Sequence, residues 1–200
     1  LLYYNDNQPE KALAAYKQVI SNYPGSEEAK VALQDLKSVY IDLNDINAYA
    51  NYVNSIGGNI RLEVGEQDSL TYIAAEKLFM RGDNEGARRS LAGYLQTFPE
   101  GAFSSNANFY LGSIAFAKKE FDEAIQRFKS VIASNDTKFL EESVARTAEI
   151  EYLGKDYPAA LESFKRLQIV AESPENKQAA RLGIMRCALQ TGQQKDALLS

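Results

Sequence analysis

The side chains that usually perform catalysis are few in this chain, and their spacing fits no active site. The sequence has no histidine, which removes the commonest general base, metal ligand and serine-triad partner. Glu141 and Glu142 are adjacent, so on a helix their carboxylates point about 100° apart, and their charge favours a helix start. Residues 42–45 lack the glycine and the glutamate of a calcium loop. We therefore expect no enzymatic activity, no metal and no cofactor.

The single cysteine and the glycines add no reactive site. Because Cys187 is alone, neither an intrachain disulfide nor a cysteine zinc cluster can form, and we interpret it as a small buried apolar side chain. Gly57 and Gly58 are an isolated pair outside any phosphate-binding motif, and they predict a turn.

Charge and hydropathy exclude two further kinds of partner. The net charge is −5, and the lysines and arginines do not cluster as a nucleic-acid-binding surface requires. No apolar run approaches the ~18 residues of a membrane-spanning helix. We expect no nucleic acid partner and no membrane span in this segment. Because both ends fall inside predicted helices, we also expect a segment of a longer protein.

The chain repeats itself at a nearly constant interval. The alanines that share this interval are Ala12, Ala87, Ala124, Ala160 and Ala197. The last three gaps are 37, 36 and 37 residues, and the first gap, of 75, is close to two of them. The bulky residues that follow four positions later are Tyr16, Leu91, Phe128 and Phe164. A period of this length indicates stacked helix pairs, each of which buries its apolar face against its neighbours.

The clearest helix pair lies near the middle of the chain. Residues 106–116 predict one helix, residues 118–120 a turn and residues 121–132 a second helix, from apolar spacings of three and four. Gly112 and Ala124 have little or no side chain, so the two helices can approach closely. Phe128 then fills the space one turn further on.

Similar turns precede the second helix of other units. Residues 81–84, 154–157 and 191–194 each contain a glycine, which can take the left-handed conformation that ends a helix. Asp83 and Asp156 are placed to cap the helix that follows. The asparagine-rich stretch 44–59 is the region that we expect to be irregular.

These patterns resemble the tetratricopeptide repeat, whose consensus is W-x2-L-G-x2-Y, then A-x3-F, then P. Leu111-Gly112 and the pair of Ala124 and Phe128 match it, whereas Asn108 stands in place of its tryptophan. The resemblance implies an all-α fold, a right-handed α-solenoid of antiparallel helix pairs with about five repeats and truncated ends. The implied boundaries are 1–25 (partial), 27–60 (diverged), 68–101, 105–135, 141–173 and 178–200 (partial).

The resemblance also implies which side chains line the concave groove of the solenoid. Three equivalent positions on each first helix would face it, mapped through the alanines. The groove residues predicted in this way are Tyr72, Glu76, Phe79, Phe109, Ser113, Phe116, Glu149 and Tyr152, with Ala145 at the remaining position. They would form an aromatic column with acidic flanks, which suits a basic or neutral peptide. The alternative is that Phe79 and Phe116 simply pack between neighbouring repeats.

The function that these features imply is that of a non-enzymatic scaffold, with a partner peptide or helix lying in the concave groove. One alternative is a structural spacer or self-association module, and another is a glycan-binding or accessory domain of a larger protein. The carboxylate clamp of the family's co-chaperone members is not matched, because Lys30 and Arg186, the basic candidates, lie at opposite ends of the chain. The chain is more similar to bacterial cell-envelope members, which implies envelope assembly and a periplasmic or outer-membrane-associated location.

Overall fold

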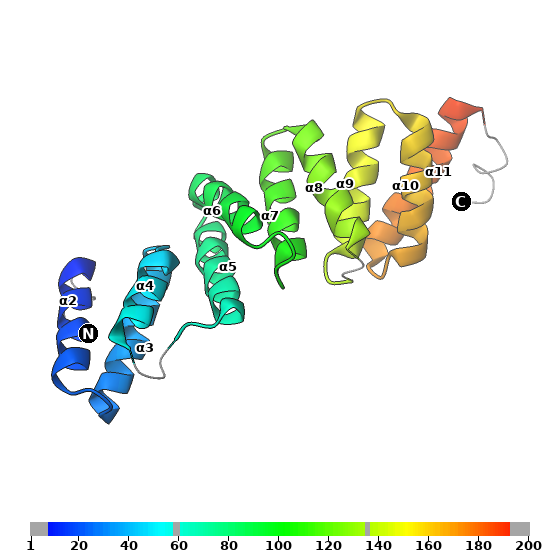
Figure 1. Ribbon diagram of the computed structural model, residues 1–200. Helices are drawn as coiled ribbons and strands as arrows, with labels where there is room; N and C mark the ends of the chain where they lie inside the picture. The colour runs from blue at the N-terminus through cyan, green and yellow to red at the C-terminus, as the bar shows by residue number, and fades with distance from the viewer. Residues whose placement is uncertain (1–7, 58–60, 135–136, 193–200) are drawn as a thin grey trace. The chain divides into compact units, whose positions relative to one another are not determined.

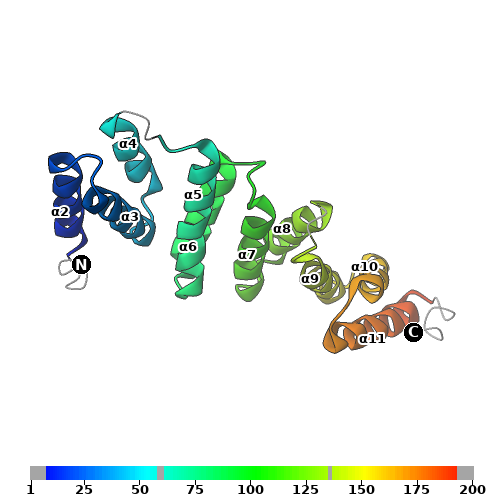
Figure 2. The same ribbon diagram turned by 90° about the horizontal axis from the view of Figure 1, so that it is seen from below.

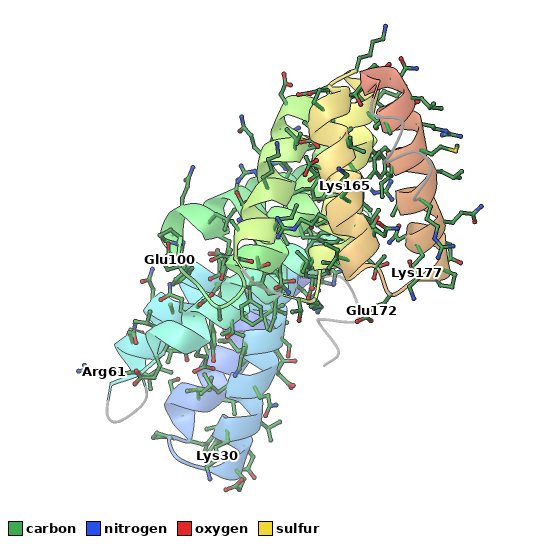
Figure 3. All side chains as sticks on the ribbon, turned by 90° about the vertical axis from the view of Figure 1, so that its right-hand side faces the viewer. Lys30, Arg61, Glu100, Lys165, Glu172 and Lys177 are labelled. Atoms are coloured by element: carbon green, nitrogen blue, oxygen red, sulfur yellow. The ribbon has the colours of Figure 1, made fainter. Side chains whose placement is uncertain are left out.

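The computed structural model describes residues 8–57, 61–134 and 137–192, and these residues form ten α-helices and no strand (Figure 1). The helices are α2 (Pro9–Asn22), α3 (Glu27–Asp42), α4 (Ile46–Ile56), α5 (Val64–Met80), α6 (Asn84–Thr97), α7 (Ser104–Ala117), α8 (Phe121–Ala133), α9 (Leu140–Leu153), α10 (Tyr157–Val170) and α11 (Pro174–Thr191). The chain divides into two compact units, Leu1–Ala102 and Phe103–Ser200. Charged side chains such as Lys30, Arg61 and Glu172 lie at the surface (Figure 3). None of the ten helices is long and apolar enough to cross a membrane.

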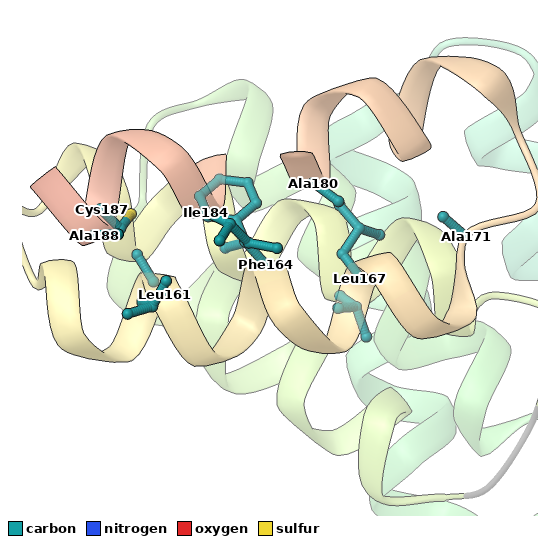
Figure 4. Packing of buried hydrophobic residues seen from close by; sticks show 11 residues of the cluster. Leu161, Phe164, Leu167, Ala171, Ala180, Ile184, Cys187 and Ala188 are labelled. Atoms are coloured by element: carbon teal, nitrogen blue, oxygen red, sulfur yellow. The ribbon is translucent and has the colours of Figure 1, made fainter. Parts of the chain in front are cut away.

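In the second unit each helix packs against the next one along the chain (Figures 1 and 2). Helices α7 and α8 form one antiparallel pair and α9 and α10 another, while contacts of α8 with α9 and of α10 with α11 stack them. The buried cluster around α10 and α11 includes Phe164, Leu167 and Ile184 (Figure 4). Burying a side chain of this size contributes about 1.5–3 kcal/mol to stability.

The first unit has a core of its own, and helix α4 in it corrects one expectation. Helix α2 packs on α3 and α5 packs on α6, with Leu36 of α3 fully buried. The stretch 44–59, which we expected to be irregular, contains the eleven-residue helix α4. The buried residues of α4 are Ile46, Tyr49, Ala50 and Val53, at spacings of three and four. This apolar stripe outweighs the modest helix propensity of the asparagines.

A residue in the left-handed conformation recurs at nearly the same interval as the alanines. These residues are Asn44, Gly82, Lys119, Lys155 and Gly192, which are 38, 37, 36 and 37 positions apart. In the first four turns, the following residue donates its N–H to the carbonyl five positions back, at 2.9–3.0 Å. This arrangement closes the end of a helix. The backbone therefore repeats even at Asn44, where the side-chain pattern is weak.

The structure tests what the sequence predicted for these turns. The glycine expectation is confirmed at Gly82 and Gly192 and wrong at Gly154, which has a φ of −73° while the next residue, Lys155, is left-handed. The predicted caps are confirmed, because Asp83 accepts a hydrogen bond from the N–H of Gly86 at 2.8 Å and Asp156 caps the N–H of Ala159 at 3.2 Å.

The predicted close approach of the central helix pair is also confirmed. A Cβ atom at Gly112 would lie 2.9 Å from a ring carbon of Phe128, so only glycine fits without a shift of the ring. The prediction of an all-α chain built from antiparallel helix pairs holds for both units. Ala197, the last alanine of the series, lies outside the described residues, and the repeat boundaries stay predictions.

Candidate functional site

An open groove of about 450 Å³ crosses the second unit between α9 and α11. The residues of its first wall, on α9, are Glu142, Ala145, Arg146, Glu149, Tyr152 and Leu153. The residues of its second wall, on α11, are Asn176, Ala179, Leu182, Gly183 and Arg186. Phe164 and Leu167 of α10 form the floor. Within each wall the spacing of three and four residues places these side chains on one helical face. We call this feature the α9–α11 groove.

Small residues explain why the groove opens at this place. One repeat earlier the corresponding space is filled by an aromatic pair, in which Phe109 stacks on Phe139 with ring centroids 4.1 Å apart. The equivalent positions, 36 and 37 residues later, hold Ala145 and Asn176. Neither side chain has the volume of a phenyl ring, so space remains between the two walls.

A third replacement removes a long side chain from the α11 wall. In the earlier repeat Arg146 lies over Phe116, with the guanidinium carbon 4.7 Å from the ring centroid. The residue 37 positions later is Gly183. A Cβ atom there would lie 2.4 Å from the ring of Phe164, so glycine lets this ring approach the backbone of α11. Phe164 keeps 9% of its surface exposed and lines the groove.

On the α9 wall one arginine is shared by two glutamates. Arg146 donates from Nε to Glu142 at 2.9 Å and from Nη1 to Glu149 at 3.0 Å. On the opposite wall Arg186 is exposed, and it forms no hydrogen bond or ion pair with the described part of the chain. The α9–α11 groove therefore presents an apolar floor beside an uncompensated positive charge.

Glu141 holds the start of the α11 wall in place. Its carboxylate accepts hydrogen bonds from the backbone N–H of Glu172 at 2.9 Å and of Ser173 at 3.1 Å, and from the side-chain amide of Asn176 at 2.8 Å. The N–H of Glu172 is the main cause that lowers the pKa of Glu141 to about 2, followed by the hydroxyl of Ser173. The interpretation of Glu141 as a mere helix-start charge missed this role.

Asp68 makes the equivalent connection in the first unit. It is 8% exposed and accepts hydrogen bonds from the hydroxyl of Tyr94 at 2.6 Å and from the N–H of Ala102 at 2.9 Å. Like Glu141, it ties the loop after a second helix to the first helix of the same pair. A carboxylate at this recurring position is a sequence signal that could have revealed both.

Two of the predicted groove residues line the α9–α11 groove. Glu149 and Tyr152 do so, together with Ala145. The ring of Tyr152 is half-buried and meets Tyr157 edge-on, with centroids 5.6 Å apart. Tyr152 thus has both a fixed position and a free edge, which suits a binding contact.

Other predicted residues are engaged within their own units. Besides stacking on Phe139, Phe109 accepts at its carbonyl a hydrogen bond from the hydroxyl of Ser113, at 2.9 Å. Tyr72 is 2% exposed, and its hydroxyl donates to Glu76 at 2.6 Å. Since the core covers Tyr72, its ring cannot present a face to a partner. Glu149 pairs with Arg146, whereas the hydroxyl that donates to Glu76 is neutral, so the expectation of a basic or neutral peptide stays a prediction.

The full aromatic column stays a prediction. Phe79 is half-buried on α5 in the first unit, whereas Phe116 and Tyr152 belong to the second. Phe116 is half-buried, with Arg146 over its ring and Phe121 against its edge at 5.8 Å. The sequence reasoning did not find the replacements that open the groove, since it followed conserved spacing instead of losses of volume between equivalent positions.

The repeats match known families. Residues 1–26 and residues 74–137 each match a model of the tetratricopeptide repeat. These two segments are similar to tetratricopeptide repeats. No curated protein matches it.

Solved structures share the fold. BtubC (BKLC) from P. vanneervenii has a TM-score of 0.54 at 10% identity, over 96% of this chain and 85% of that one. The apo form of RapI has a TM-score of 0.51 at 16% identity, over 98% of this chain and 59% of RapI. MamA AMB-1 has a TM-score of 0.51 at 14% identity, over 83% and 91%. At these identities the likeness shows the α-solenoid fold alone.

Tetratricopeptide repeats are typical of protein–protein interaction scaffolds, and members of the family are generally not catalytic. Many unrelated functions share this architecture, so the function has to be argued from the α9–α11 groove itself.

Proposed function

We propose that this tetratricopeptide repeat chain is a scaffold that binds a segment of another protein in the α9–α11 groove. The observation that carries the proposal is the smaller residues Ala145, Asn176 and Gly183 at positions that hold large side chains one repeat earlier, which leaves a groove above Phe164 and Leu167. A volume of about 450 Å³ accommodates a few side chains of a peptide. The segment would continue along the exposed faces of α9 and α11.

Exposed apolar side chains on the rim support the proposal. Leu153 is 54% exposed on one wall and Leu182 is 38% exposed on the other. Covering apolar surface contributes about 25 cal/mol for each Å² removed from water. A partner that lies across the groove would cover both rims and the floor together.

The test begins with selection of binders from a displayed library of random peptides, followed by affinity measurement with the synthetic peptides. Ala179 is exposed and lines the groove, so Ala179→Trp fills the groove without entering the core. We expect this variant to weaken binding by at least about tenfold, which is 1.4 kcal/mol. The matched control is Gln178→Trp, because Gln178 is the exposed neighbour that does not line the groove.

Truncation of Tyr152 gives an independent test of the same wall. Tyr152→Ala should also weaken peptide binding, and the combined change of Phe79, Phe116 and Tyr152 tests the whole predicted column. Parent affinity in a folded Ala179→Trp variant would contradict the groove as the binding site.

The more specific expectations from the sequence, which are self-association, sugar binding and an envelope location, remain proposals. Light scattering at high concentration tests the self-association alternative, which a strict monomer contradicts. A glycan array tests the sugar-binding alternative. Fractionation of cells that express the full-length protein tests the envelope location and role.

A further inference from the structure

We infer that the partner of the α9–α11 groove is a peptide in which a large apolar side chain is flanked by an aspartate or glutamate. The apolar side chain would lie on Phe164 beside Gly183, and the carboxylate would pair with Arg186. This inference rests on the proposed function and adds the chemistry of the partner to it.

The apolar half follows from the floor. Phe164 and Leu167 form it, and the ring of Phe164, which packs against the backbone of Gly183, keeps 9% of its surface exposed. An apolar side chain that covers this ring removes both surfaces from water. A polar side chain would lose its hydration there without a hydrogen-bonding partner on the floor, which is unfavourable.

The charged half follows from a comparison of equivalent positions on the two walls. On α9, Arg146 lies between Glu142 and Glu149 and pairs with both. The residues 37 positions later on α11 are Gly183, Ala179 and Arg186 respectively. The charge pattern of one wall is therefore not reproduced on the other. At the position equivalent to Glu149, α11 has Arg186. The position equivalent to Glu142 is Ala179, so no carboxylate stands there to pair with Arg186.

Arg186 thus lacks an internal counter-ion in the described residues, and a partner that covered it without providing one would pay for its desolvation. The wider wall has the same sign, since α11 contains Lys177, Arg181 and Arg186 against the single acidic residue Glu175. On the opposite wall Glu142 and Glu149 share the single positive charge of Arg146, so that wall keeps a net charge of −1. At Arg186 itself, which has no counter-ion in the described residues, charge complementarity favours a carboxylate of the partner over an ammonium group.

The experiment uses the same random-peptide library and the whole chain. Peptides that bind the parent should be enriched in an acidic residue close to a large apolar one. Arg186→Glu should weaken the best acidic peptide by at least about tenfold. A peptide with its acidic residue changed to lysine should recover affinity for Arg186→Glu, which a general loss of structure could not produce.

Arg181→Glu is the matched control. It makes the same charge change on the same helix, at an exposed residue that does not line the groove. We expect it to keep near-parent affinity. Equal effects of Arg181→Glu and Arg186→Glu would overturn the inference, because they would show a general dependence on charge.

The outcomes distinguish a failure of the proposed groove binding from a failure of the inference that the partner is acidic. If Ala179→Trp abolishes binding while Arg186→Glu leaves it unchanged, the groove stands as the site and the acidic partner is wrong. Enriched peptides without acidic residues would have the same meaning. If no peptide is enriched, or if Ala179→Trp has no effect, the proposed function fails and the inference fails with it.

Discussion

At the scale of single residues, the carboxylate of Glu141 does more for the groove than its position in the sequence suggests. It gathers backbone and side-chain donors from residues 172–176 and so fixes where α11 begins. A carboxylate that accepts several hydrogen bonds prefers its charged form, which explains its low pKa.

This role predicts a dependence of stability on pH. The folded-state pKa of Glu141 is about 2, against 4.5 for the unperturbed group, so its contribution is complete above pH 4.5 and is lost as the pH falls toward 2. Glu141→Gln should lower the free energy of unfolding at neutral pH by about 1–3 kcal/mol, and the difference from the parent should shrink toward pH 2. Urea unfolding followed by circular dichroism measures the free energy of unfolding of the parent and the variant at each pH.

The neighbouring residue provides the control for this prediction. Glu142→Gln removes a partner of Arg146 in an ion pair whose side chains are 38% and 42% exposed, which should cost less than about 1 kcal/mol. A loss in Glu141→Gln that does not change with pH would contradict the low folded-state pKa of Glu141, because glutamine keeps the shape of glutamate and changes only its charge and hydrogen bonding.

At the scale of helices, glycine has opposite effects depending on what lies beside it. Gly112 faces the ring of Phe128, and an added Cβ atom would lie 2.9 Å from it. Gly93 is also inside a helix, α6, and an added Cβ atom would meet nothing within 4 Å. The same substitution therefore distinguishes packing from helix propensity.

We predict that Gly112→Ala lowers the free energy of unfolding by about 1–3 kcal/mol, because the ring of Phe128 has to move in a close-packed core. Gly93→Ala should raise it by about 0.5–1 kcal/mol, because alanine favours the helix. Thermal or urea unfolding of both variants shows whether each substitution raises or lowers the free energy of unfolding. Stabilisation by Gly112→Ala would mean that the approach of α7 and α8 is looser than described.

The helix scale also shows what could be predicted from the sequence. The pair 106–116 and 121–132, its turn and the caps at Asp83 and Asp156 could be predicted, because they depend on local spacing and on side chains next to a helix end. Helix α4 could not, because its asparagines suggest a loop and its apolar stripe is stabilised by packing against α3 and α5, which the local sequence does not show.

The site was less predictable than the fold. Glu149 and Tyr152 were found through the family pattern, whereas Gly183 and Asn176 matter for the volume that they lack. Such a loss is visible only when two repeats are compared position by position in a structure. Tyr72 was placed in the groove by the same pattern, yet the covering side chains around it bury it.

At the scale of the whole molecule, the two compact units predict that damage stays local. Leu36 of α3 and Leu167 of α10 are fully buried in separate cores. Replacing either leucine by alanine should lower the free energy of unfolding by about 2–5 kcal/mol. In an array of repeats this loss is felt mainly by adjacent elements.

Hydrogen exchange measured by mass spectrometry tests this locality. Leu36→Ala should speed exchange in α2 to α4 and leave α9 and α10 near their parent rates, and Leu167→Ala should do the reverse. Equal acceleration along the whole chain in either variant would show that the two units unfold as one.

The recurring left-handed turn has a consequence for how such a chain can grow. Residues 120–155 begin just after one turn residue, Lys119, and end at the next, Lys155, so both boundaries have the same backbone geometry and the same closing hydrogen bonds. A tandem copy of this segment would join itself without breaking a helix or inverting an apolar face. Extension by whole repeats is therefore compatible with the existing packing, whereas an insertion inside a helix would rotate the rest of that helix and turn its apolar face away from its neighbours.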